Sequence, residues 1–152
     1  MAYKLAYSGL FWEAPHLERE LAVLQDAGWD GWEVRQPLDW LGTPGRVRKL
    51  CERFGVEVAA VCGPNATLNV DDPSHQINKR RIEFAAELGV ATFMTKGPGR
   101  GQRVCSDQEL DQMAAVYEDL AVYGDTLGVC VTFHPHINHL VNGEEEWKRF
   151  MH

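Results

Sequence analysis

The sequence predicts an α/β fold with a parallel sheet, and two repeated features carry this prediction. Short apolar segments alternate with longer segments in which apolar residues recur at helical spacing. The long helical segments end in glycines at positions 28, 55, 89 and 128, and an apolar segment follows each of them almost at once. Glycine there adopts the left-handed conformation that closes a helix. Strands that alternate with helices imply right-handed crossovers and a parallel sheet.

Five strands are expected, and each is short and mostly apolar, as in a sheet whose strands are buried. They cover residues 4–8, 31–35, 56–62, 91–96 and 129–134. The last begins as a β-branched, apolar run and ends where Pro135 interrupts it, because proline cannot donate to a sheet ladder. His134 therefore stands at the carboxyl end of a strand and His136 just beyond it, where α/β folds place their chemistry.

Helix starts are predicted by capping side chains and by prolines that suit a first turn. They are Pro15, Thr43-Pro44, Asp72-Pro73, Ser106 with Glu109, and Asn142 with Glu145. In the helix that follows Asp72, one face is expected to be buried and the other to face solvent. The expected buried residues are Ile77, Phe84, Ala85 and Leu88, and the expected exposed ones are Lys79, Arg80 and Arg81.

Composition indicates a globular domain that spans residues 1–152 without a linker. The formal net charge of −7 argues against nucleic acid or an anionic membrane as a partner. The cysteines at positions 51, 62, 105 and 130 are far apart, and Cys51 and Cys130 occupy apolar positions, so buried, reduced thiols are expected. The chain shows no secretory signal pattern and no apolar run that approaches a membrane span. We therefore expect a cytoplasmic protein.

Two architectures accommodate alternating strands and helices. A flavodoxin-like open sheet, which would make the chain a binding protein, needs about five strands. A (β/α) barrel needs around 250 residues, so the chain would supply about five of its eight βα units. The strands are each followed by polar or aromatic residues, which are Trp12, Arg35, Asn65, Lys96 and His134. A barrel collects all these ends on one rim, and no glycine-rich phosphate loop follows the first strand, so the incomplete parallel barrel is favoured.

Three segments resemble one family. Gly-Trp-Asp-Gly-Trp-Glu-Val-Arg at 28–35 resembles the second strand of the xylose isomerase-like TIM barrels, and residues 78–94 resemble their third helix and fourth strand. Phe-His-Pro-His-Ile-Asn-His-Leu-Val at 133–141, followed by Glu-Glu-Glu-Trp, resembles the fifth strand and helix of the inosose dehydratase-like and sugar phosphate isomerase-like members. The resemblance covers essentially the whole chain, as the amino-terminal portion of the family's barrel.

The resemblance implies an enzyme that isomerises, epimerises or dehydrates a small sugar, polyol or hydroxy-carbonyl with the help of a divalent metal. Many members carry a glutamate, their first metal ligand, at the position of His134. The resemblance therefore makes His134 the expected metal ligand, with His136 as the alternative. Neutral imidazole suits Mn, Co, Zn or Fe better than Mg. The later strands that carry most of the family's ligands are absent from the sequence.

Six further residues are expected to serve the site. The expected catalytic residues are Glu33, Lys96 and His136, and the expected substrate-binding residues are Trp12, Arg100 and Asn138. Structural alternatives stand beside several of them: Glu33 forms an ion pair with Lys4, Arg35 or Lys96; Trp12 packs; and residues 97–101 form a mobile glycine loop with incidental cations. The alternative for His134 and His136 is a loop that happens to hold two exposed histidines. The remaining histidines are expected to be solvated, namely His16, His75, His139 and His152.

A second hypothesis makes the chain a non-catalytic domain that self-associates or binds a ligand through an unclosed rim. An incomplete barrel has two free edges and an inner face without an opposite wall. The inner face is expected to expose Ala6, Val34, Ala60, Met94 and Val131, or their alternating neighbours. Exposed apolar surface of that kind favours association, or membership in a longer polypeptide.

Overall fold

The structure is a computed structural model that describes residues 3–10, 12, 16–101 and 104–151. Its strands are β1 (Ala6–Ser8), β2 (Gly31–Val34), β3 (Glu57–Cys62), β4 (Thr92–Thr95) and β5 (Cys130–Phe133). Its helices are α1 (Leu17–Asp26), α2 (Leu38–Leu41), α3 (Pro44–Phe54), α4 (Pro73–Leu88), α5 (Asp107–Thr126) and α6 (Glu144–Phe150). All the expected strands are present, and the short helix α2 is an element that the sequence did not predict.

The strands form one sheet in the order β1-β2-β3-β4-β5, and every neighbouring pair is parallel. This sequential order confirms the incomplete (β/α) barrel. It excludes the flavodoxin-like alternative, in which β1 would have strands on both sides.

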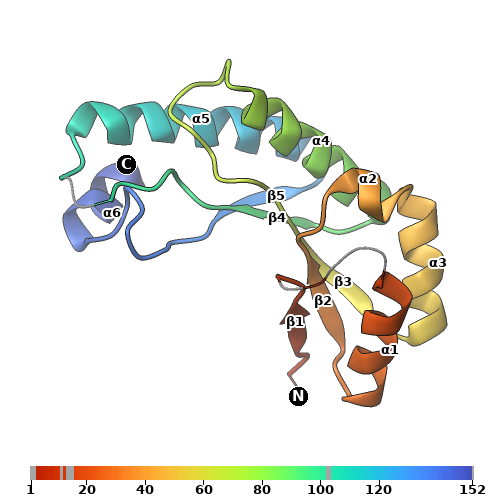
Figure 1. Cartoon of the computed structure of the whole chain (residues 1–152). Coiled ribbons are helices and arrows are strands. Elements are labelled where there is room, and N and C mark those ends of the chain that lie inside the picture. Colours follow the sequence, from red (N-terminus) through yellow and green to blue (C-terminus); the bar gives the residue numbers. More distant parts are fainter. Residues whose placement is uncertain (1–2, 11, 13–15, 102–103, 152) are drawn as a thin grey trace.

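The helices cover one side of this sheet. Within the described ranges α1 contacts α3, α3 contacts α4, α4 contacts α5, and α5 contacts α6, as in the outer ring of a barrel. Figure 1 shows this succession, with α1 and α3 beside β1–β3 and with α4 and α5 along β4 and β5. Beneath the helices lie strand residues that are completely buried, namely Trp32, Val34, Val61 and Phe93. Among residues 3–10, 12, 16–101 and 104–151, no helix is long and apolar enough to cross a bilayer.

The opposite face of the sheet is less apolar than the sequence predicted. Val34 is fully buried on the helix side, and Val131 lies on that side too, because its Cγ2 is 2.9 Å from the place of a Cβ on Gly124 of α5. Ala60 is only 7% exposed. For Val34 and Val131 it is therefore the alternating neighbours that face inward, which was the other alternative, whereas Ala60 lies on the inner face beside Glu33 but is hardly exposed. The inner face instead presents Ser8, Glu33, Cys62, Met94 and Thr132, which alternate with the buried strand residues.

Two cysteines follow the prediction and one does not. Cys51 and Cys62 are buried free thiols, whereas Cys130 is exposed. Cys130 pairs with Thr92 in the β4–β5 ladder. The next pair, Phe93 with Val131, lies on the helix side, so the Cys130 side chain points to the inner face. The expectation that Cys130 is buried was wrong because its position in the pleat, and not its apolar neighbours, decides its side of the sheet.

The predicted helix caps are largely confirmed. The Thr43 and Asp72 side chains accept backbone N–H groups at the starts of α3 and α4, and Ser106 with Glu109 forms the capping box of α5. The last helix begins one residue later than predicted, with Gly143 as its N-cap and Glu146 as the capping carboxylate. Asn142 with Glu145 was therefore the wrong pair. The glycines at 28, 55, 89 and 128 all have positive φ. Pro15 and His152 lie outside the described residues.

The face of α4 that packs on the sheet also differs from the prediction. Ile77 is 37% exposed, whereas Arg81 is only 4% exposed and His75 only 2%. The buried stripe runs through His75, Asn78, Ile82 and Ala85, which follow the spacing of one helix face. The expectations that Arg81 and His75 face solvent and that Ile77 is buried were wrong because this stripe contains polar residues.

Gly124 provides a test of how tightly α5 packs on β5. A Cβ at this helical position would lie 2.5 Å from the Val129 carbonyl oxygen. Gly124→Ala is therefore expected to lower the free energy of unfolding by about 1–3 kcal/mol, as overpacking does. Urea unfolding followed by circular dichroism measures this change.

Gly45 is the matched control, since it is also helical but has only Thr43 Oγ1, at 4.0 Å, near its Cβ position. Gly45→Ala is expected to leave stability unchanged or to raise it by up to about 1 kcal/mol, because alanine has the higher helix propensity. Wild-type stability of Gly124→Ala would contradict the close contact between α5 and β5.

Candidate functional site

Ionisable side chains gather on the inner face at the carboxyl ends of β2–β5. Val34 pairs with Val61, which places the following residues Arg35 and Cys62 side by side. Thr95 pairs with Phe133, which places Lys96 beside His134 in the same way. Since parallel strands end at the same edge of a sheet, the sequence prediction that these ends share one rim is confirmed for β2–β5.

Glu33 is held by Arg35. Its Oε2 accepts hydrogen bonds from Arg35 Nη2 at 2.7 Å and from Nε at 3.0 Å, and Arg35 Nε also lies 2.7 Å from Ser8 Oγ. Both side chains of the pair are 21% exposed. Of the three ion pairs that the sequence left open for Glu33, the structure forms the one with Arg35; Lys4 instead pairs with Glu57 at 2.8 Å.

His134 presents its imidazole to this face. Burial lowers its pKa, and the positive charge of Arg35 lowers the pKa further. Its Nδ1 lies 3.2 Å from Met94 Sδ, a weak acceptor, which favours the tautomer with hydrogen on Nδ1 and a free lone pair on Nε2. An imidazole in this state is ready to bind a metal or accept a proton.

Two further histidines continue from His134 along the rim. The ring of His136 is 6.1 Å from that of His134, and the ring of His139 is 5.0 Å from that of His136. His139 is half-buried, and its Nδ1 lies 2.5 Å from the Gly97 carbonyl oxygen. The expectation that His139 is solvated was therefore wrong, because it ties the segment after β5 to the loop after β4. His16 is exposed, as predicted.

The described residues alone do not make a metal centre. They contain no group of three or more histidine, cysteine, aspartate or glutamate side chains placed to hold an ion. His134 Nε2 fits the role of one ligand, but the nearby carboxylate of Glu33 is engaged by Arg35. A catalytic zinc site uses about three protein ligands.

The loop after β4 is tied to the segment after β5. Arg100 donates its backbone N–H to the Asn138 carbonyl at 2.8 Å, and Leu140 donates to the Pro98 carbonyl at 3.0 Å. The Arg100 guanidinium pairs with Glu146 at 2.7 Å. Asn138 has φ 63°, a left-handed conformation. Arg100 and Asn138, both expected to bind substrate, thus have defined structural partners.

Trp12 packs and also lines a cavity. Its ring stacks on Trp32, with centroids 4.5 Å apart, and on Tyr7 at 6.2 Å. It borders a cavity of about 360 Å³ at the ends of β1 and β2. The other lining residues are Gly9, Leu10, Arg35, Gln36, Pro37 and Trp40. The packing alternative for Trp12 is therefore observed, and its ring also faces a space that Arg35 reaches.

Arg81 has a structural role at the rim that the sequence did not predict: its buried side chain binds backbone carbonyls at the strand ends. From α4, its Nε donates to the Cys62 carbonyl at 2.5 Å, and its two Nη atoms donate to the Gln36 carbonyl at 3.0 and 2.9 Å. Gln36 Nε2 in turn donates to the Gly9 carbonyl at 2.5 Å. Arg81 thus links the ends of β2 and β3, and Gln36 links that of β2 to the end of β1. The stripe of His75, Asn78 and Arg81 at intervals of three residues was the available signal.

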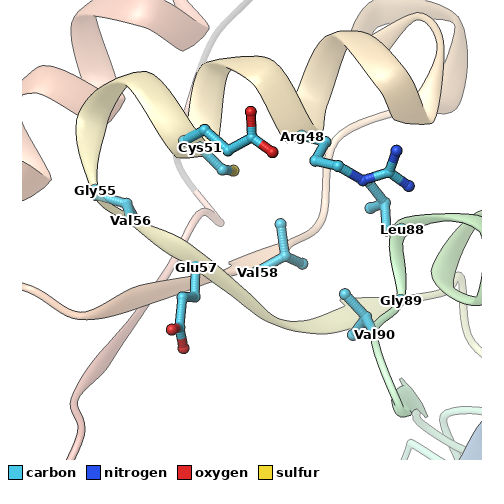
Figure 2. A pocket seen from close by; sticks show the side chains of 10 residues that line it. Arg48, Cys51, Gly55, Val56, Glu57, Val58, Leu88, Gly89 and Val90 are labelled. Atoms are coloured by element: carbon cyan, nitrogen blue, oxygen red, sulfur yellow. The ribbon is translucent and has the colours of Figure 1, made fainter.

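A second cavity, of about 460 Å³, lies at the opposite end of the sheet. Figure 2 shows Gly55, Val56 and Glu57 at the start of β3, and Gly89 and Val90 just before β4. These are the amino ends of the strands, the end of a barrel that serves stability. The ionisable rim, and not this cavity, is the candidate functional site.

Comparison with known proteins agrees with this architecture. Residues 21–152 match the model of the xylose isomerase-like TIM barrel. The chain belongs to this family. No curated protein matches the sequence.

Solved structures of the same fold are sugar epimerases and related proteins. The 3-keto-D-glucoside 4-epimerase from E. coli aligns with a TM-score of 0.79 and 15% identity, over 99% of this chain and 64% of that one. D-allulose 3-epimerase from Methylomonas sp., in complex with D-allulose, aligns with a TM-score of 0.76 and 17% identity, over 97% and 57%. The IolI protein with a binding zinc atom aligns with a TM-score of 0.71 and 19% identity, over 97% and 58%. The chain thus spans 57–64% of the length of these three structures, and identities this low show the fold alone.

Arg81 and its neighbour Arg80 provide a test of the rim. Arg81→Met is expected to lower the free energy of unfolding, by about 1–3 kcal/mol for each carbonyl left without a donor. Arg80 is exposed, so Arg80→Met is expected to change stability little. Chemical unfolding of the two variants measures the difference. Equal effects of the two substitutions would contradict the structural role of the buried guanidinium.

Proposed function

We propose that the protein is a sugar isomerase/epimerase-like or polyol dehydratase-like enzyme that acts on a small sugar, polyol or hydroxy-carbonyl. The observation that carries this proposal is the gathering of a carboxylate, an ammonium and an imidazole at the carboxyl ends of β2, β4 and β5. The names of its structural neighbours, among them an L-ribulose 3-epimerase, support the same class of reaction. We further propose that residues 1–152 belong to one domain.

The proposed chemistry is the transfer of a proton at the carbon next to a carbonyl. Glu33 would accept this proton, and His136, at the rim, would return one. The Lys96 ammonium would stabilise the substrate oxygen as it gains negative charge. Arg35 serves this scheme by fixing the Glu33 carboxylate at 2.7 Å.

Substrate binding is assigned to three residues around these groups. Trp12 would stack on the apolar face of a sugar ring, since it already borders the cavity next to Arg35. Arg100 and Asn138 would orient hydroxyl groups from the two linked loops.

A divalent metal would be held through His134. Its Nε2 would supply one ligand to Mn, Co, Zn or Fe in preference to Mg, since imidazole suits these ions. When bound, such an ion polarises a carbonyl–hydroxyl pair. The remaining ligands would come from outside the described residues, and the zinc atom in the IolI structure supports metal use within this fold.

Replacement of His134 tests the proposal. His134→Ala in the full-length protein is expected to lose bound metal and to lose at least about 10²-fold in turnover. Metal content is measured by mass spectrometry. Turnover is measured by proton NMR in D₂O, where ketoses such as D-allulose lose the signal of the proton next to the carbonyl.

His16→Ala is the control for this experiment, because His16 is exposed and its side chain makes no capping hydrogen bond to α1. His75 does not serve as a control, since it is buried and contacts Asp119 at 2.6 Å. Undiminished metal content in His134→Ala would move the ligand to His136, and undiminished exchange as well would refute the role of His134.

Self-association is a second candidate role. β1 and β5 each pair with one strand within the described sheet, so each leaves one edge unpaired. We expect a chain of residues 1–152 to associate through these edges and not through the inner face, because the inner face is polar. Sedimentation at micromolar concentration tests this expectation. A stable monomer of 17.2 kDa would contradict it.

A further inference from the structure

The cavity at the amino ends of β3 and β4 lies apart from the rim and has no part in the proposed function. Its walls come from α3, from the start of β3, and from the turn between α4 and β4. Figure 2 shows Arg48 and Cys51 of α3 above this space, and Val58 and Val90 below it. Its volume of about 460 Å³ falls within the range of roughly 300–1,000 Å³ that small-molecule sites occupy. A small organic ligand therefore fits.

The floor of the cavity is apolar. Val56 is 2% exposed, and Cys51 and Val90 are each 9% exposed. Val58 and Leu88 are half-buried and complete this surface. Burial raises the pKa of the Cys51 thiol, so the sulfur is uncharged at neutral pH and behaves as an apolar group. The floor therefore suits an aliphatic group.

The ends of two helices give one side of the cavity a negative character. Gly55 is the C-cap of α3 and Gly89 that of α4, and both line the cavity. The carboxyl end of a helix carries a partial negative charge of about half an elementary charge. Glu52, in the last turn of α3, adds a carboxylate that makes no ion pair or hydrogen bond with residues 3–10, 12, 16–101 and 104–151. Arg53, in the same turn, is already paired with Glu18 at 3.0 Å. This side therefore favours an ammonium group.

Arg48 brings a positive charge to the same cavity. Its Nη2 donates to the Glu87 carbonyl near the end of α4, so the guanidinium spans from one helix to the other. Within the described chain its Nη1 and Nε make no hydrogen bond. Glu52 is one helical turn away, at a spacing of about 5–6 Å between Cβ atoms, yet no ion pair joins it to Arg48. The other carboxylate that lines the cavity, Glu57, is held by Lys4 at 2.8 Å.

We propose that this cavity binds a free α-amino acid with an aliphatic side chain, such as leucine. The ligand's carboxylate would accept hydrogen bonds from Arg48 Nη1, and its ammonium would pair with Glu52 beside the carboxyl end of α3. Because both charged groups of an α-amino acid are attached to one carbon, a single molecule can reach the two side chains. The aliphatic group would cover Val56 and Val90, which removes apolar surface from water.

Matched ligands test this proposal, since each lacks one of the three recognised groups. Saturation-transfer difference NMR on the full-length protein compares L-leucine with 4-methylpentanoate, which has no ammonium, with 3-methylbutylamine, which has no carboxylate, and with glycine, which has no side chain. L-Leucine is expected to bind at least about tenfold more tightly than each of the other three, because charge-assisted hydrogen bonds and apolar burial both contribute.

Two variants identify the residues responsible. Arg48→Met is expected to reduce the preference over 3-methylbutylamine to about twofold or less, and Glu52→Gln to do the same for the preference over 4-methylpentanoate. Arg19→Met is the control, because Arg19 is exposed on α1 and does not line the cavity. Thermal unfolding of each variant separates loss of binding from loss of folding.

Three results would overturn the proposal. They are no saturation transfer to L-leucine at concentrations up to about 10 mM, equal affinity for L-leucine and any of the three analogues, or an undiminished preference in either variant. The proposed function fails separately. Absence of proton exchange at the rim, with leucine binding intact, would refute the isomerase/epimerase assignment and leave the amino-acid site standing.

Discussion

The buried guanidinium of Arg81 is the interaction on which the shape of the rim depends. It is 4% exposed, and its donors bind the Cys62 and Gln36 carbonyls, where the chain leaves β3 and β2. Burial lowers the pKa of Arg81, which records the cost of removing this charge from water. Because hydrogen bonds to a buried charge are strong and directional, one side chain from α4 sets the relative positions of two loops that border the candidate site.

The sheet has two chemically different faces. The face under the helices is closed by Trp32, Val34, Val61 and Phe93, all of which are fully buried. The opposite face carries small and polar side chains, among them the Glu33–Arg35 pair with side chains that are 21% exposed. Charged groups are retained there, at the cost of partial desolvation, in the part of a barrel where chemistry occurs. This polarity is what a ligand-binding interior requires.

The loops beyond β4 and β5 depend on each other in the same way. The His139 Nδ1 contacts the Gly97 carbonyl. Arg100 pairs with Glu146 and so connects the loop after β4 to α6. Glu146 also caps the first turn of α6, by accepting the Gly143 N–H. One carboxylate therefore stabilises both a helix start and a loop at the rim. Lys96 and His134 stand at the base of these two loops, where backbone pairing holds them. The His134 side chain also contacts Met94 through Nδ1, which leaves its Nε2 without a hydrogen bond among the described residues.

The sequence by itself determined the order and type of the elements. Alternating apolar and helical segments, positive-φ glycines and capping residues such as Ser106 are local signals, and local sterics and hydrogen bonds suffice to interpret them. The same signals placed His134 and Lys96 at strand ends. The tertiary structure alone decided on which face each strand residue lies, since a shift of one position in a pleated strand reverses the side. That is why the sequence left open whether Val34 and Val131 or their neighbours face inward, and why Cys130 was misplaced.

The tertiary structure likewise decided which polar residues are buried. The spacing of His75, Asn78 and Arg81 defines one face of α4, but nothing local shows that this face is buried while that of Arg80 is exposed. The difference arises because one stripe of α4 faces β3 and β4, where backbone carbonyls at the strand ends accept the donors of a long cationic side chain. Partners such as Cys62 and Gln36 are far from Arg81 in the sequence, and only folding brings them within hydrogen-bonding distance.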